Sequence, residues 1–577
     1  MFAQYSARML ATAINRSPAL TQQRLPSSFG RLTASAYKPQ PAAGQMFSSS
    51  RLVAKQPSNK CQGSANPTGN NAYKSSYASF GKLSLAFATG GSLALAGYAL
   101  ATRQDSTGSK TTPAETNAVV HPPVDEVFKS VAKKHNESRA LLDGVPREKR
   151  NNAAKQLAQL TDEEVNTVLR AKEKSWCLKP KPDGSKIRVD TNQIPSNSRI
   201  EDYLTFAALG SSDGAASLSN TGRYMFGVFD GHAGHQCAEH VSSRMGSVLE
   251  ESLNAVAQLA EIRSGDIGAA LISPTASESV FATVAQIASE VGPSWGQVPL
   301  ALTAAFVNLD EEIVNGAVEK YRSLQEQNQQ VDIAKLLGPG VAGSCGLVAV
   351  VDTEAKQVVV ANTGDSGALI GVRLDSGAWK AVRLSHDQTM ANPDELIRMI
   401  REHPGEKDIA LEGRVLGGLM PTRAFGDSRY KLPAEVQKEL FPLLLPLGFS
   451  YATSPTRLKR PPYVTACPVV ITHKLSANDK FLVLATDGLY DQLDDDEIVN
   501  TVAQWYETHG SKTSTNSSTP TTRDSNAATH LIRAAFSVDW NGSKGDETTR
   551  RMLAIPSPVS RSYRDDISVT VVTLDDN

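Results

Sequence analysis

The sequence lacks paired cysteines. Its 577 residues include five cysteines, an odd number, which are widely scattered and form no Cys-x-x-Cys pair. This pattern argues against a disulfide framework and against a thiolate zinc site, and it favours a reducing compartment. The chain also contains no GxGxxG or GxxxxGK[ST] loop and no internal repeat, so a nucleotide-binding site has no support.

Acidic residues are absent from the first 104 positions, which hold 11 Lys and Arg. The whole chain has 59 basic and 60 acidic residues, so the remainder carries 48 basic against 60 acidic residues. With a formal charge of -1, no nucleic-acid partner is expected. Arg8 and Arg16, set among apolar and small residues, predict a mitochondrial transit peptide within a basic, disordered region over residues 1–60. The alternative is a basic tail without targeting function.

Charge is also missing from residues 83–102, a run of about the 20 residues that span a bilayer. Its glycines and hydroxyl side chains weaken the membrane signal. An inner-membrane anchor, a sorting segment that is removed and a Gly-interrupted apolar patch all stay open. Residues 103–155 are polar and charge-mixed, and we expect a linker with one helix near Val124–Leu142.

From about residue 156 the pattern predicts an α+β domain that extends to residue 577. A helix begins after the Thr161 to Glu164 capping box, and further helical spacing covers residues 238–253 and 494–506. Residues 508–530, rich in Ser, Thr and Asn, are expected to form a loop insertion without core-forming power. The expected strands are residues 224–229, 346–351, 357–361, 368–372, 481–485 and 567–574.

Carboxylates recur where these apolar strands meet turns. A single Asp in this position is usually a turn former. Several at one sheet edge would concentrate negative charge, for which hard divalent cations with oxygen ligands are the natural partner. Glu201 and Asp202 add enough carboxylates for two six-coordinate ions that keep several waters, which favours Mg or Mn over Zn. The strand-end residues are Asp230, Asp365, Asp487, Asp565 and Asp566.

His232 follows Asp230 and Gly231 directly. A lone His beside a turn is normally exposed and without function. Beside metal-binding carboxylates it is a group that titrates near neutral pH and a candidate general acid.

Five segments in order resemble the metal-dependent protein serine/threonine phosphatases of the protein phosphatase 2C (PP2C) type, and the resemblance extends from Leu160 to Thr573. Within that family, residues 160–166, 419–427 and 461–466 are most similar to the catalytic subunit of pyruvate dehydrogenase phosphatase. The five segments are Val228–Gly234, Asn362–Ser366, Arg423–Asp427, Leu484–Asp491 and Arg564–Ile567.

The resemblance implies an α-β-β-α sandwich of two antiparallel sheets with a metal channel at one end. Asp230 would bridge two Mg or Mn ions, the Gly231 carbonyl would bind one of them, and Asp487 and Asp565 would bind the other. The bridging water would attack phosphorus in line. His232 would protonate the departing Ser or Thr oxygen.

The resemblance assigns supporting roles to further carboxylates. Glu201 matches a residue that reaches the metal through water, and Asp365 and Asp491 match ligands of a weaker third ion. The residues expected to support the ligands are Asp202, Asp427 and Asp566.

The chain departs from the family at three positions. Asn197 stands where the family has its phosphate-binding Arg, and Arg199, displaced by about 6 to 7 Å along a strand, is the candidate phosphate ligand. Gly367 stands where the family usually has Arg, and Cys467 where it usually has Glu. The last two affect local support and partner recognition more than chemistry.

Competing interpretations differ in class. Gly364–Gly367 superficially resembles a trypsin-like nucleophile loop, but Ala368 follows where a further Gly is expected. A pseudophosphatase that only binds is disfavoured because every matched metal carboxylate is present. Among active enzymes, a phosphatase acting on the phosphorylated E1 alpha subunit of the pyruvate dehydrogenase complex leads, and the alternative is a mitochondrial phosphatase with other protein substrates. An anchored chain facing the intermembrane space would favour that alternative over a matrix enzyme.

Overall fold

The computed structural model describes residues 124–142, 145, 153–154, 156–178, 187–210, 222–264, 277–291, 296–509, 524–538 and 545–574. The predicted transit peptide over residues 1–60 and the charge-free segment over residues 83–102 lie outside these ranges and stay predictions. Within the described ranges, no helix combines the length and the apolar character needed to cross a membrane.

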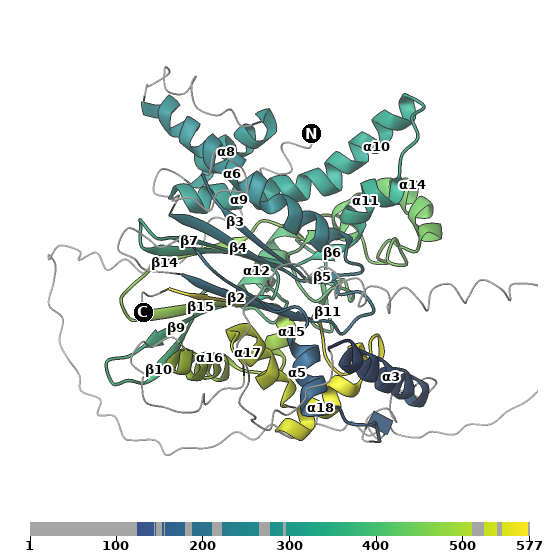
Figure 1. The fold of residues 1–577 in the computed structure, drawn as a ribbon. Coiled ribbons are helices and arrows are strands. Elements are labelled where there is room, and N and C mark those ends of the chain that lie inside the picture. Colours follow the sequence, from purple (N-terminus) through teal and green to yellow (C-terminus); the bar gives the residue numbers. More distant parts are fainter. Residues whose placement is uncertain are drawn as a thin grey trace, which may run out of the picture. The chain divides into compact units, whose positions relative to one another are not determined.

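Two antiparallel sheets form the centre of the fold, as the resemblance implied (Figure 1). The six-stranded sheet has the order β1 (Lys174–Cys177), β2 (Arg188–Ile194), β16 (Ile567–Thr573), β15 (Asp479–Ala485), β9 (Gly367–Arg373) and β10 (Trp379–Arg383). The five-stranded sheet has the order β14 (Val469–Lys474), β8 (Gln357–Thr363), β7 (Gly346–Asp352), β4 (Arg223–Phe229) and β3 (Tyr203–Ala208).

The faces of the two sheets that point toward each other enclose an apolar core. Phe226 and Val228 of β4 and Leu347 of β7 pack in one cluster with Leu482 and Leu484 of β15, and none of them is more than 1% exposed. Because β7 and β15 are buried on both faces, their sequences are nearly continuous apolar runs rather than alternating ones. This explains why both strands were recognisable from the sequence.

Helices cover the outer face of each sheet, which completes the α-β-β-α sandwich (Figure 1). On the five-stranded sheet lie α6 (Gln236–Ser264) and α9 (Gln297–Glu311), with α8 (Glu278–Val291), α10 (Ala317–Glu326), α11 (Ile333–Val341) and α14 (Ala434–Leu444) around them. On the six-stranded side lie α16 (Asp495–His509) and α17 (Ala527–Phe536), with α3 (Val124–Leu142), α5 (Asp162–Arg170) and α18 (Asp546–Ala554) beside them.

Short elements connect these layers. A three-stranded sheet has the order β13 (Phe425–Gly426), β6 (Gly343–Ser344) and β5 (Gly231–His232), and β11 (Ala410–Leu411) pairs with β12 (Arg414–Val415). The remaining helical segments are α12 (Pro393–Glu402), α13 (Ser428–Lys431), α15 (Asp487–Tyr490), the π-helical turn Glu312–Gly316, and the 3-10 turns Leu445–Leu447 and Val559–Ser562.

The α+β class, the six expected strands and the capping box at Thr161 are confirmed. Two boundaries need correction. The helix predicted inside the linker, α3, packs against α5 and α18, because Val127, Val131 and Leu142 are buried there. The predicted loop insertion over residues 508–530 ends earlier, because Asn526 caps α17 and the next two residues are buried.

Candidate active site

The five-stranded sheet brings three of the predicted carboxylates to one edge. β4 ends at Phe229, whose cross-strand partner is Tyr203, the first residue of β3. Glu201 and Asp202 therefore enter the sheet at the edge where Asp230 leaves it. The antiparallel pairing, and not proximity in sequence, makes these residues neighbours.

The six-stranded sheet adds a second group of carboxylates. β15 ends at Ala485, whose partner is Val569 near the start of β16. Asp487 is the first residue of α15, just after β15, and Asp565 and Asp566 come just before β16. A strand end and a strand start again share an edge.

The two groups face each other, and their charges interact strongly. Burial raises the pKa of Asp230 well above its ordinary value, and repulsion from Asp487, Asp202, Asp565 and Asp365 raises it further. Burial likewise raises the pKa of Asp487, with repulsion from Asp365 and Asp565 added. Because the surrounding protein does not offset the negative charge of these carboxyls, the group must either bind protons or bind a cation.

The donor set fits a hard divalent cation. The Asp487 Oδ1 atom is buried and has no hydrogen-bond partner, which is costly unless a ligand binds it. Within the residues described here, no group of three or more His, Cys, Asp or Glu side chains is arranged so that it could hold a metal ion. Mg and Mn suit such a site because they keep several waters and need only one or two carboxylates each.

Asp491, which directly follows α15, lies within the same field of charge. Burial raises its pKa, and so does repulsion from Asp365. The Cys345 thiol donates to Asp365 Oδ1 at 3.1 Å. The structure thus brings the two residues predicted for a third ion close enough to repel each other.

Asp566 anchors the loop that precedes β3. Its Oδ1 accepts from the backbone N–H of Ser196 at 2.5 Å and of Asn197 at 3.2 Å. Its Oδ2 accepts from the Asn197 side-chain amide at 3.2 Å and from the Glu201 backbone N–H at 2.8 Å. Asn197 therefore helps to hold this loop against Asp566.

Asp202 and Gly231 pack under the carboxylate cluster. The Thr486 hydroxyl donates to Asp202 Oδ2 at 3.0 Å, and burial together with repulsion from Asp566 raises the Asp202 pKa well above its ordinary value. A Cβ at Gly231 would overlap the backbone carbonyl oxygen of Glu201. Only glycine allows the two chain segments to approach this closely.

His232 lies beside the cluster and is oriented by Asp427. Its Nε2 atom is 2.6 Å from Asp427 Oδ2, and its side chain is 26% exposed. Burial lowers the pKa of His232, but attraction to Asp427 and the hydrogen bond between them outweigh that effect and raise it. The protonated form of His232 is thereby favoured, as a general acid requires.

The predicted phosphate ligand, Arg199, pairs with Glu239 at 3.3 Å and also approaches the Tyr203 hydroxyl at 3.4 Å. Arg561 was not singled out from the sequence, yet its Nη1 contacts Asp565 Oδ2. Its spacing of four residues before a predicted metal ligand was the available signal. Arg564 lies deeper, with its guanidinium over the Phe536 ring at 4.7 Å.

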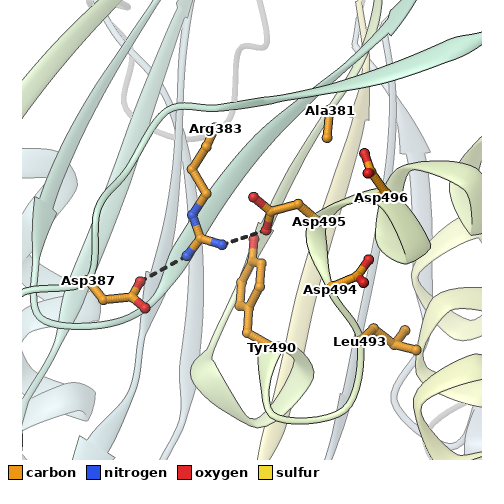
Figure 2. A pocket seen from close by; sticks show the side chains of 8 residues that line it. All are labelled: Ala381, Arg383, Asp387, Tyr490, Leu493, Asp494, Asp495 and Asp496. Carbon is orange, nitrogen blue, oxygen red and sulfur yellow. Dashed lines mark hydrogen bonds and ion pairs between the residues drawn. The ribbon is translucent and has the colours of Figure 1, made fainter. Parts of the chain in front are cut away.

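The departure at Gly367 has a packing explanation. A Cβ there would overlap the Tyr490 ring, so no larger residue fits. Arg383 from β10 instead places its guanidinium over that ring at 4.4 Å, and it also pairs with Asp495 at 2.6 Å and with Asp387 at 2.9 Å (Figure 2). These residues line an open pocket of about 600 Å³ next to α15.

The departure at Cys467 is also accommodated. Arg423 donates from Nη1 to the Cys467 carbonyl at 2.7 Å and pairs with Glu395 of α12 at 2.6 Å. Glu395 also pairs with Arg398 at 2.8 Å, and all three charged side chains are at most 6% exposed. The carboxylate partner of Arg423 therefore comes from α12.

The two-sheet sandwich thus carries a group of buried carboxyls at one sheet edge. Residues 300–539 match the family described as Protein phosphatase 2C. Human mitochondrial pyruvate dehydrogenase (acetyl-transferring) phosphatase 2 is 32% identical over 461 residues, which cover 72% of this chain and 83% of that protein. Human phosphatase 1 of the same name is 34% identical, with the same shares covered.

A yeast relative, the pyruvate dehydrogenase (acetyl-transferring) phosphatase 1 of Saccharomyces cerevisiae, is 32% identical over 72% of this chain and 73% of its own length. Serine-threonine phosphatase 2C from Toxoplasma gondii, a solved structure, aligns with a TM-score of 0.38 and 18% identity over 70% of this chain and 99% of that chain. The chain belongs to the protein phosphatase 2C family and is a protein serine/threonine phosphatase, similar to the pyruvate dehydrogenase phosphatases.

Proposed function

We propose that this phosphatase removes phosphate from Ser and Thr of mitochondrial proteins, with the E1 alpha subunit of pyruvate dehydrogenase as its main substrate. The observation that carries the catalytic part is the convergence of buried, mutually repelling carboxyls at one edge of both sheets. The substrate and the mitochondrial location are supported by the names of the relatives. A mitochondrial phosphatase with other protein substrates is the alternative.

Two Mg or Mn ions would be held by Asp230, the Gly231 carbonyl, Asp487 and Asp565, with Glu201 acting through water. When bound, they would lower the pKa of a water between them and offset the charge of the phosphate. A weaker third ion would be held by Asp365 and Asp491.

The chain's own residues supply the rest of the chemistry. His232 donates its proton to the departing Ser or Thr oxygen, and Asp427 keeps the ring oriented and protonated. Asp566 holds the loop that carries Glu201 at a fixed position beside the cluster. These positions are set by strand ends, and rigid elements of this kind preserve catalytic geometry.

The test uses the full chain and its Asp230→Asn variant with phosphorylated pyruvate dehydrogenase E1 alpha and with phosphorylated casein. We expect release of phosphate that requires Mg or Mn, is faster on E1 alpha, and disappears in the variant, while thermal unfolding shows that the variant is folded. Equal rates on both substrates would favour the broader phosphatase. Metal-dependent turnover in the folded variant would overturn the site, and an inactive wild type would support the pseudophosphatase.

A further inference from the structure

Arg561 stands between the carboxylate cluster and solvent. It belongs to the 3-10 turn Val559–Ser562, and its side chain is 49% exposed although its guanidinium contacts Asp565. Asp565 lies just before β16, among the carboxylates gathered at the sheet edge.

Two other arginines near the site contact groups other than the side-chain carboxylates of the cluster. Arg199 pairs with Glu239 on α6. Burial lowers the pKa of His235, and the positive charge of Arg199 lowers it further. Arg564 donates to the Pro195 carbonyl at 2.8 Å and to the Asp565 carbonyl at 3.3 Å from beneath the cluster. Burial lowers the pKa of Arg564 to about 10.

The ion pair of Arg561 contributes little to the stability of the fold. Its ion pair with Asp565 spans four residues and is half exposed on the Arg side, and such pairs contribute about 0–1 kcal/mol. Asp565 is also a carboxylate that the proposed function gives to a metal. Once a cation takes up that negative charge, the guanidinium donors of Arg561 are available to an anion at the mouth of the site.

We propose that Arg561 binds the phosphoryl group of the substrate, in place of the family's Arg, whose position here is held by Asn197. The inference rests on the proposed function, since it needs the metal-loaded site. A guanidinium presents a planar fork of donors that matches two phosphate oxygens, which a single ammonium does not. No covalent step is assigned to Arg561; it positions the phosphate and offsets its charge.

The test compares Arg561→Gln, Arg561→Lys and Arg199→Gln, with Arg322→Gln as a matched control. Arg322 of α10 is 45% exposed and forms a surface ion pair with Glu439 of α14. Three quantities are measured with Mg or Mn present: the dissociation constant of inorganic phosphate by calorimetry, its inhibition constant, and KM and kcat for a phosphoserine peptide. Thermal unfolding during a metal titration supplies the metal affinity.

We expect Arg561→Gln to raise both the dissociation constant of inorganic phosphate and KM by about 10- to 100-fold, the usual range for a hydrogen bond to a charged group. Both constants of Arg561→Lys should lie between those of Arg561→Gln and the wild type. The metal affinity of Arg561→Gln is unchanged or tighter, because Asp565 loses a competing cation. Arg199→Gln and Arg322→Gln bind phosphate as the wild type does.

Two results would overturn this assignment while the proposed function survives. In the first, the wild type is active, and Arg199→Gln rather than Arg561→Gln loses phosphate affinity. In the second, Arg561→Gln loses metal affinity and stability while its phosphate affinity is unchanged. A wild type that neither turns over nor binds phosphate in the presence of metal overturns both proposals together.

Discussion

At the scale of single residues, a glycine lies beneath the His232 and Asp427 pair. A Cβ at Gly343 would overlap both His232 Nε2 and Asp427 Oδ2. Gly343 also pairs with His232 between β6 and β5 and with Gly426 between β6 and β13. The smallest residue therefore sets the distance between the candidate general acid and its partner.

Gly343→Ala is expected to separate His232 from Asp427 without removing either charge. Turnover of phosphoserine peptides should fall by about 100-fold, the lower end of what general acid catalysis contributes. Steady-state kinetics measures the loss. Gly296→Ala is the control, since a Cβ there makes only an ordinary contact with Pro299. Full activity of Gly343→Ala would show that the pair is dispensable.

His232→Gln should slow hydrolysis of phosphoserine peptides by about 100- to 10,000-fold, because an alkoxide leaving group needs a proton donor. Hydrolysis of an activated aryl phosphate should change little, since its leaving group departs unprotonated. Parallel kinetics on both substrates distinguishes the roles. Equal losses on both would remove His232 from the acid role.

At the scale of elements, β2 shows what sequence patterns miss. Its central residues Asp190, Thr191 and Asn192 are polar and at most 8% exposed, so the strand has no apolar alternation. Their partners come from distant segments: the Asn192 amide donates to Leu169 at 2.6 Å and to Thr529 at 2.9 Å. A polar strand buried inside a sheet is stable only because its polar groups find such hydrogen-bond partners.

The helix α3 should contribute to stability as part of the folded domain. Val127, Val131 and Leu142 are buried, and Lys134 pairs with Glu164 at 2.5 Å. A chain starting at residue 143 should lose about 1.5–3 kcal/mol of unfolding free energy for each fully buried apolar side chain, compared with a chain starting at residue 124. Urea denaturation measures the difference. Equal urea midpoints of the two chains would show that α3 does not stabilise the domain and behaves as a linker.

The buried ion network of α12 predicts a dependence of stability on pH. Burial raises the pKa of Glu395, but attraction to Arg423 and Arg398 outweighs this and holds it far below its usual range. A carboxyl with a depressed folded pKa stabilises the fold above the unfolded pKa of about 4.3 and loses that contribution as the pH falls.

Glu395→Gln should therefore cost about 3–5 kcal/mol at pH 7, since it leaves the buried charge of Arg423 without its carboxylate partner. The unfolding free energy of the variant should also fall less than that of the wild type as the pH drops below about 5. Urea denaturation at several pH values gives both quantities. An unchanged slope in acid would mean that other carboxyls dominate the acid response.

At the scale of the whole molecule, the chain divides into an acid-free beginning and an acidic phosphatase domain. Deleting residues 1–60 should leave the protein outside mitochondria, because the Arg8, Arg16, Arg24 and Arg31 series is the import-like signal in the sequence. Fluorescence of tagged full-length and truncated chains decides this. If the truncated chain still reaches mitochondria, the targeting signal lies outside residues 1–60.

Protease protection in intact mitochondria and mitoplasts then separates the matrix from the intermembrane space. Protection of the catalytic domain in mitoplasts is expected for an enzyme that acts on matrix pyruvate dehydrogenase. Digestion in mitoplasts would indicate an inner-membrane anchor over residues 83–102 and would favour the alternative substrates.

The sequence by itself determined the local features. Apolar runs that end in Asp230, Asp365 and Asp487 are contiguous along the chain, so the strands, their ends and their carboxylates were predictable from neighbouring residues. The α+β sandwich followed from the resemblance carried by these same short segments. Local signals of this kind survive because strand formation and turn chemistry depend on adjacent residues.

Only the tertiary structure decided which long-range contacts form. The pairing of Arg199 with Glu239 and the ion pair between Arg423 and Glu395 join residues 28 or more positions apart, and the place of β2 in its sheet depends on partners hundreds of residues away. Arg561 became a candidate because the 3-10 turn Val559–Ser562 brings its guanidinium into contact with Asp565. Side-chain bonds of this kind depend on how strands pair and helices pack, which the one-dimensional pattern does not specify.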